Sequence, residues 1–145
     1  MTSWILIANG SEARIYNRSA NRSGLQIVSE HQHPESRMKS ADLISDRSGH
    51  YQSDSSSMGR GSYQEPTPPK EHEMERFAHE LADTLDEGRM TRKFNRLVLV
   101  SPPHFSGLLT KQLHKEVKNL VSTNVGKDYT KVAENKLLEQ LSPYL

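Results

Sequence analysis

The chain opens with two short apolar segments joined by a turn. Residues 4–8 are an unbroken apolar run, which is typical of a buried strand. Asn9 and Gly10 form a strong short-range turn signal, and residues 13–17 then alternate between polar and apolar side chains. The pattern therefore predicts a hairpin of two strands.

A third strand is predicted at residues 25–28, after a turn at residues 21–24. Because side chains alternate between the two faces of a strand, Arg14 and Tyr16 should share one face of the second strand, with Ile15 on the other. The opening segment is thus predicted to be a three-stranded meander.

Between residues 31 and 69, apolar residues follow neither the spacing of a helix nor the alternation of a strand. This segment contains nine serines and three glycines, and it holds almost no large aliphatic residues. A structureless segment of this length inside a small domain is usually either functional or disordered. We therefore expect a flexible loop at about residues 33–69, in which residues 38–44 are a candidate for a short helix or strand.

An amphipathic helix is predicted at residues 70–87. Glutamates crowd its first turns, where the helix dipole favours negative charge, and Gly88 provides a stop signal. Apolar residues recur every three or four positions along one side. They are Met74, Phe77, Ala78, Leu81 and Leu85.

The second half of the chain predicts two more strands and two more helices. Residues 94–100 are suited to a central strand that is covered on both faces, and residues 105–121 have helical spacing. A short strand at residues 125–130 and a helix at residues 133–141 follow. The order βββ–loop–α–β–α–β–α predicts an α/β fold in which a mixed five-stranded sheet is flanked by helices.

The composition places these elements in one domain covering residues 1–145. Hydrophobic residues make up 33% of the chain, and the mean hydropathy is -0.78. The chain has no cysteine, so it can form neither a disulfide nor a thiolate site. The apolar run at residues 4–8 is too short for a signal peptide, and no stretch approaches the ~20 apolar residues of a membrane span. We expect a soluble, cytoplasmic protein.

The net charge of +1 hides a segregation of charge along the chain. Residues 70–87 carry two basic and seven acidic residues, whereas residues 88–131 carry nine basic and two acidic residues, a net of +7. A stripe of lysines on the predicted second helix could bind phosphates in a salt-sensitive way, and two later lysines could extend it. The alternative is an ordinary solvated helix face. The lysines are Lys111, Lys115 and Lys118, then Lys127 and Lys131.

The long polar segment mixes cations, glycines and an aromatic side chain, and such a segment can order on an RNA or protein surface. The alternative is a plain solvated insertion. The candidate contact residues are Arg47, Gly49, His50, Gly59, Arg60, Gly61, Tyr63 and Gln64.

The seven histidines do not form a convincing metal motif. His31 and His33 would share a strand face, and His72 and His79 would lie on one side of the first helix. Neither pair has the i, i+4 spacing of a metal-binding helix or a third ligand. We therefore expect no metal and no cofactor.

Ser101 and His104 follow a predicted strand, at the edge where α/β sheets often bind ligands. The string Ser-Pro-Pro-His lacks a nucleophile elbow, and its prolines suit a turn from strand to helix. No residue is predicted to be catalytic.

Three segments carry a family resemblance: WILIANGSEARIY at residues 4–16, LVLVSPPHF at residues 97–105 and KDYT at residues 127–130. In these strings and in its element order, nearly the whole chain resembles the host attachment protein family, bacterial proteins described as required for attachment to host cells. That family in turn resembles the middle domain of eukaryotic and archaeal class-1 translation release factors.

The resemblance implies a ribonuclease-H-like sheet and a loop before the first long helix. In release factors this loop bears Gly-Gly-Gln, enters the ribosomal peptidyl-transferase centre and helps to hydrolyse peptidyl-tRNA. Here the equivalent segment reads GRGSYQ at residues 59–64, and the chain contains no Gly-Gly-Gln. Because that chemistry needs glycine-only backbone geometry beside the ester, catalysis is not carried over.

The leading hypothesis is therefore a non-enzymatic binding module that contacts RNA or the ribosome through its basic half and its loop. A protein–protein or host-adhesion factor is the first alternative. The second is an enzyme, either a peptidyl-tRNA esterase or a nuclease.

Overall fold

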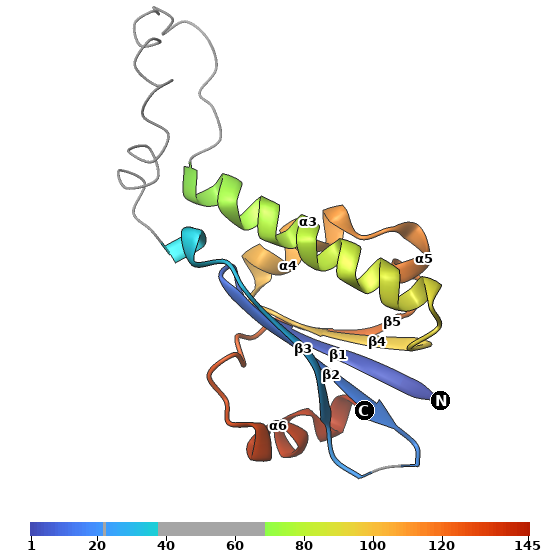
Figure 1. The fold of residues 1–145 in the computed structure, drawn as a ribbon. Coiled ribbons are helices and arrows are strands. Elements are labelled where there is room, and N and C mark those ends of the chain that lie inside the picture. The colour runs from blue at the N-terminus through green and yellow to red at the C-terminus, as the bar shows by residue number, and fades with distance from the viewer. Residues whose placement is uncertain (22, 38–68) are drawn as a thin grey trace, which may run out of the picture.

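Five strands form one mixed sheet at the centre of the computed structural model, which describes residues 1–21, 23–37 and 69–145 (Figure 1). They lie in the order β3-β2-β1-β4-β5. β1 pairs antiparallel with β2 and parallel with β4, β2 pairs antiparallel with β3, and β4 pairs parallel with β5. The predicted mixed five-stranded α/β fold is confirmed. The strands are β1 (Thr2–Ala8), β2 (Glu12–Ser19), β3 (Gln26–Gln32), β4 (Arg96–Val100) and β5 (Val121–Val125).

Helices cover both faces of the sheet (Figure 1). The helices α3, α4 and α5 lie on one face, and α6 covers the other. The helical elements are η1 (Pro34–Arg37), α3 (Pro69–Met90), α4 (Pro103–Gln112), α5 (Lys115–Lys118), α6 (Glu134–Leu141) and η3 (Ser142–Tyr144).

Alternation along the central strands divides the core into two layers. Trp4 and Leu6 of β1 pack with Phe77 on the α3 face, whereas Ile5 and Ile7 pack with Leu137 on the α6 face. The parallel strands β1 and β4 are therefore apolar on both sides, as expected for strands covered on both faces.

The stop predicted at Gly88 is wrong, because α3 continues through it to Met90. A Cβ on Gly88 would lie 2.6 Å from two ring atoms of Trp4 and 3.1 Å from Phe94. Glycine at this position thus lets the helix approach the sheet closely.

The helix predicted at residues 105–121 is broken in two, and the strand predicted at residues 125–130 lies earlier. Leu113 and His114 are extended, with ψ angles of 139° and 150°. Leu113 is still buried, and the break redirects the chain so that the Leu97 amide donates to the Leu120 carbonyl at 2.9 Å. β5 can then begin at Val121.

The third strand is longer than the predicted 25–28, since β3 continues to Gln32. The predicted loop at about 33–69 is shortened at both ends, by η1 and by the start of α3 at Pro69. Residues 38–68, including the candidate element at residues 38–44, lie outside the described residues.

Candidate nucleic-acid interface

The two ends of the parallel strands β1, β4 and β5 provide a frame for the polar residues. We call the side of the sheet where these strands begin the amino end, and the side where they finish the carboxyl end. Figure 1 shows that the last turns of α3 and the short α5 lie at the amino end.

The structure separates the predicted lysines into different elements. Lys111 is in the last turn of α4, whereas Lys115 and Lys118 belong to α5, and all three are exposed. Because the chain changes direction at Leu113 and His114, the single helix face predicted for them does not form. The short α5, which contains Lys115 and Lys118, instead lies at the amino end of the sheet (Figure 1).

Lys127 and Lys131 lie at the carboxyl end, beyond the last residue of β5. Five residues of strand separate them from α5 by roughly 13 Å at least. Lys131 Nζ lies 3.0 Å from Glu12 Oε2. The described structure therefore does not bring these two lysines together with Lys115 and Lys118.

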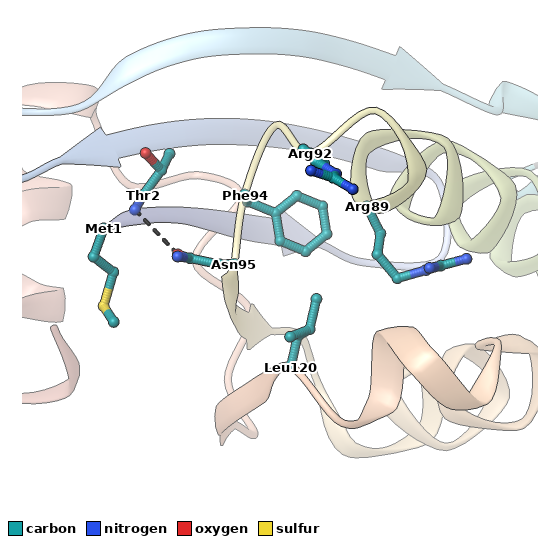
Figure 2. A pocket seen from close by; sticks show the side chains of 7 residues that line it. All are labelled: Met1, Thr2, Arg89, Arg92, Phe94, Asn95 and Leu120. Carbon is teal, nitrogen blue, oxygen red and sulfur yellow. Dashed lines mark hydrogen bonds between the residues drawn. The ribbon is translucent and has the colours of Figure 1, made fainter.

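Two arginines that were counted in the basic segment but not proposed as site residues line a pocket of about 440 Å³ at the amino end (Figure 2). Arg89 is in the last turn of α3, and Arg92 follows it. The rest of the lining comes from the start of β1 and from the turns that lead into β4 and β5. It consists of Met1, Thr2, Phe94, Asn95 and Leu120.

Arg89 is held in place by an acidic neighbour on its own helix. Its Nε and Nη2 donate to Asp86 Oδ1 at 3.0 and 2.8 Å, and His114 Nε2 lies 3.7 Å from Asp86 Oδ2. Arg89 therefore presents an ordered guanidinium, although Asp86 offsets part of its charge.

Four further cations lie at this end on the α3 face: Arg92, Lys93, Lys115 and Lys118. They are exposed to solvent and have no acidic partner in the part of the chain that the structure describes. We call the five residues the amino-end basic cluster: Arg89, Arg92, Lys93, Lys115 and Lys118.

Arg92 has a left-handed backbone conformation, with φ at 58°. Helices commonly end on such a residue, but the position is usually glycine because a Cβ is disfavoured there. The chain thus keeps a cation at a position where glycine would be better for the backbone.

Phe94 lines the pocket and is stacked on Trp4. The rings of Trp4 and Phe94 are 4.7 Å apart and inclined by 28°, and Phe94 is 4% exposed. Asn95 Oδ1 accepts a hydrogen bond from the Thr2 amide (Figure 2). Since Phe94 is covered, a ligand here would meet arginines at the rim more than an aromatic face.

Polar groups at the carboxyl end bind one another. Asn9 Oδ1 accepts from the amides of Ser11 and Glu12, while its Nδ2 donates to Asp128 Oδ2 and Thr130 Oγ1, each at 3.1 Å. Asp128 Oδ1 in turn accepts from the amide and hydroxyl of Thr130. These bonds tie the β1–β2 turn to the segment that follows β5.

The charge of Asp128 is stabilised by this network. Desolvation acts to raise its pKa, but hydrogen bonds from Thr130 and Asn9 and the charge of Lys131 outweigh it, so the pKa lies below the ordinary value. The carboxylate therefore acts as an acceptor that holds the turn.

Arg14 and Tyr16 share the α6 face of β2, as predicted. Arg14 Nη1 donates to Tyr16 Oη at 2.9 Å, and its Nη2 donates to the Thr130 carbonyl at 2.9 Å. Burial raises the pKa of Tyr16, although Arg14 opposes the shift. This pair also connects β2 to the segment after β5.

The described histidines lie near carboxylates. His33 Nε2 lies 2.8 Å from Glu73 Oε1 and 3.9 Å from Glu35 Oε1, and its ring stacks on Phe77 at 5.6 Å. His72 and His79 face Glu75 and Asp83 of their own helix. Among residues 1–21, 23–37 and 69–145 no group of three His, Cys, Asp or Glu side chains converges as a metal site would require.

Ser101 and His104 do not form a catalytic pair. Ser101 is 1% exposed, and its Oγ has no hydrogen-bond partner among the described residues. His104 is exposed, with its Nε2 2.8 Å from Glu71 Oε1. The buried hydroxyl and the exposed imidazole thus belong to different surroundings.

The loop candidates all lie outside the described residues, so their predicted roles stay predictions. They are Arg47, Gly49, His50, Gly59, Arg60, Gly61, Tyr63 and Gln64. In the described part of the chain, no helix combines the length and apolar character needed to cross a membrane.

Solved structures identify the class of fold. The chain is similar to an archaeal translation termination factor, with 11% identity and a TM-score of 0.51, over 99% of this chain and 38% of that protein. A second similarity is to an archaeal protein, with 11% identity and a TM-score of 0.46, over 99% of this chain and 38% of that protein. A third is to the Aquifex aeolicus Ppx/GppA phosphatase, with 15% identity and a TM-score of 0.38, over 86% of this chain and 35% of that protein. The chain thus spans well under half the length of these proteins. The fold is of the type found in the termination factor.

The family follows from the sequence. Residues 4–141 match the family described as "Protein required for attachment to host cells", and the chain belongs to that family. No curated protein shows significant similarity to the chain.

Proposed function

We propose that this chain is a non-enzymatic, cytoplasmic binding module whose amino-end basic cluster contacts the phosphate backbone of RNA, as part of the ribosome or as free RNA. The observation that carries the proposal is that two neighbouring elements at the amino end both carry cations. The end of α3 and its turn hold Arg89, Arg92 and Lys93, and the adjacent α5 holds Lys115 and Lys118. Contacts to phosphate need such cations and no base-specific geometry.

The lack of internal partners supports this proposal. At the carboxyl end, Lys131 lies near the carboxylate of Glu12. Arg92, Lys93, Lys115 and Lys118 lack such a partner among the described residues. Glu87 and Glu116 are close to these cations in the sequence. The positive electrostatic potential of the cluster is therefore limited to its immediate surface.

The fold adds a second line of support. A protein whose domain is similar in fold is named as a translation termination factor, and termination takes place on an RNA-rich particle.

Fluorescence anisotropy of a labelled single-stranded oligoribonucleotide across a salt series tests the proposal. If about four phosphates are contacted, the logarithm of the association constant should fall with the logarithm of salt concentration with a slope of about -3. The variant Lys115→Glu/Lys118→Glu should bind roughly 10- to 100-fold more weakly and with a smaller slope, because two contacts become repulsive.

A matched double variant provides the control. Lys127→Glu/Lys136→Glu has the same change in net charge, and both lysines are exposed and distant from α5. It should retain most of the affinity. Equal losses in the two double variants, or binding that ignores salt, would contradict a contact at the amino end.

A protein-binding function, as the family description suggests, is the second candidate, and an exposed apolar pair favours it. Ile27 and Val28 of the edge strand β3 are 47% and 42% exposed. The outer edge of β3 pairs with no other strand of the described residues, and such an edge can receive a strand from a partner. Ile27→Lys/Val28→Lys should then reduce adhesion in a host-cell binding assay while leaving RNA affinity unchanged.

A further inference from the structure

Two arginines face each other across the first strand on the α6 face of the sheet. In the register of the sheet, Ser3 of β1 lies opposite Arg18 of β2 on one side and opposite Arg96 of β4 on the other. Residues in register point to the same face, so the three side chains form one row, Arg18–Ser3–Arg96. They line a pocket of about 200 Å³ at the amino end, on the opposite face from the pocket of Arg89 and Arg92.

One arginine of the row is held by the protein and the other is not. Arg96 Nε donates to Ser122 Oγ at 3.0 Å, and its Nη2 donates to the Tyr144 carbonyl at 3.3 Å. Arg18 has no hydrogen-bond or ion-pair partner among residues 1–21, 23–37 and 69–145. Arg96 thus presents an oriented guanidinium, while Arg18 is available to a ligand.

No acidic side chain offsets the two charges at this pocket. Its lining contains no Asp or Glu, and no carboxylate of the described residues, that of Leu145 included, forms an ion pair with Arg18 or Arg96. Ser3 is 7% exposed and places a hydroxyl between the arginines. Two like charges and a hydroxyl around one hollow make a favourable site for an anion.

The spacing suits a tetrahedral oxyanion. Two strand spacings separate the backbones of Arg18 and Arg96 by about 9.5 Å. An oxyanion that accepts a hydrogen bond of about 2.9 Å on each side spans nearly that distance, and the long side chains can close the remainder. A guanidinium can donate two parallel bonds to such a group.

We propose that the Arg18–Ser3–Arg96 row binds a phosphomonoester. A phosphomonoester offers three free oxygens and close to two negative charges at neutral pH, which matches two arginines and one hydroxyl. A phosphodiester within an RNA backbone has two free oxygens and one charge, so it fits this row less well. The site is independent of the amino-end basic cluster, which lies on the other face.

Isothermal titration calorimetry with inorganic phosphate at constant ionic strength tests the site, with dimethyl phosphate as the diester probe. Phosphate should bind, and dimethyl phosphate should bind at least 10-fold more weakly. Arg18→Gln should weaken phosphate binding by about 10-fold, because one charge-assisted pair of hydrogen bonds is lost. Arg18 has no internal partner, so this variant should keep its melting temperature.

Arg76→Gln is the matched control, since it removes one exposed arginine of α3 that lines neither pocket. It should bind phosphate as the wild type does. The proposal is overturned if phosphate does not bind, if Arg18→Gln binds like the wild type, or if Arg76→Gln loses as much affinity as Arg18→Gln.

The source of the phosphomonoester is resolved by comparing oligoribonucleotides that carry a 5′-phosphate or a 5′-hydroxyl. A preference for the 5′-phosphate that disappears in Arg18→Gln would assign the end of an RNA as the ligand. Phosphate binding without that preference would assign a small phosphorylated molecule, and either outcome supports the site. Because Arg18→Gln leaves the basic cluster intact, loss of phosphate binding with unchanged affinity for 5′-hydroxyl RNA would separate this site from the proposed RNA contact.

Discussion

The two ends of the sheet use polar residues in opposite ways. At the carboxyl end, the side chains of Asn9, Asp128 and Thr130 form hydrogen bonds with one another. Arg14 donates hydrogen bonds to the Tyr16 hydroxyl and the Thr130 carbonyl. At the amino end, most cations point to solvent without a partner in the described part of the chain. Internally satisfied groups stabilise the fold, whereas cations left free are available for binding.

The comparison also separates family resemblance from binding. The segments at residues 4–16 and 127–130 supply the hydrogen-bond network of the carboxyl end. The cations of the amino-end basic cluster come from other parts of the chain. The family resemblance therefore concerns residues that stabilise the fold. The binding proposal depends on the positions of cations that lie outside those segments.

The largest expected effect on stability is at Gly88, where α3 meets the sheet beneath the amino-end pocket. Gly88→Ala should destabilise the protein by about 2–3 kcal/mol, because the new methyl group would overlap the Trp4 ring. Chemical denaturation measures the change. Gly107→Ala, in α4 with nothing within 4 Å of its Cβ, is the control and should gain up to ~1 kcal/mol. If both variants were stabilised, the close packing at Gly88 would be contradicted.

The next effect is at Asn9, the centre of the carboxyl-end network. Asn9→Ala should cost about 2 kcal/mol, since the donors and acceptors around it lose their partners. Affinity for RNA should stay unchanged. Asn135→Ala, on the exposed side of α6, should change stability by less than about 0.5 kcal/mol. If Asn9→Ala lost RNA affinity at temperatures where the variant is folded, the claim that the carboxyl end stabilises the fold while the amino end binds RNA would be contradicted.

A smaller, pH-dependent effect is expected at Asp128. Its pKa in the folded state is below the ordinary value of 3.8, so the carboxylate stabilises the fold above that value and loses its contribution as the pH falls through the folded pKa. Asp128→Asn should cost about 1 kcal/mol at pH 7, an amount already reduced for the exposure of the site. The difference from the wild type should shrink below pH ~4. Melting curves at several pH values measure it, and a deficit that grows in acid would contradict the assignment.

The smallest effect on stability, at Arg92, sharpens the contrast most. Arg92→Gly should gain up to ~1 kcal/mol, because glycine tolerates the left-handed backbone at φ 58°. The same change should weaken RNA binding several-fold. A variant that is more stable and binds RNA as well as the wild type would remove Arg92 from the interface.

Much of the fold could be predicted from the sequence, because the strands at residues 4–8 and 94–100 and the helix at residues 70–87 have strong periodic patterns. The break at Leu113 could not, since no Gly or Pro marks it and both Leu113 and Val117 fit a continuous helix. It forms because packing under α3 and pairing of β5 with β4 outweigh the local preference.

The candidate site was predicted in part. The basic segment was visible as a run of charge, but the sequence gives no sign that Lys115 and Lys118 join Arg89 and Arg92 while Lys127 and Lys131 lie elsewhere. The row of Arg18 and Arg96 depends on strand register across 78 positions of the chain, with Ser3 as the shared neighbour. Such a juxtaposition is produced by the tertiary fold and leaves no local pattern.

The most direct test of the central claim is a ¹⁵N NMR titration of the full chain with a 5′-hydroxyl oligoribonucleotide, followed by residue. We predict that shift changes concentrate at the end of α3, the turn into β4 and α5, and that they weaken as salt is raised. Shift changes confined to the Asn9 turn and to residues 127–131, or absent from α5, would contradict an RNA contact at the amino end.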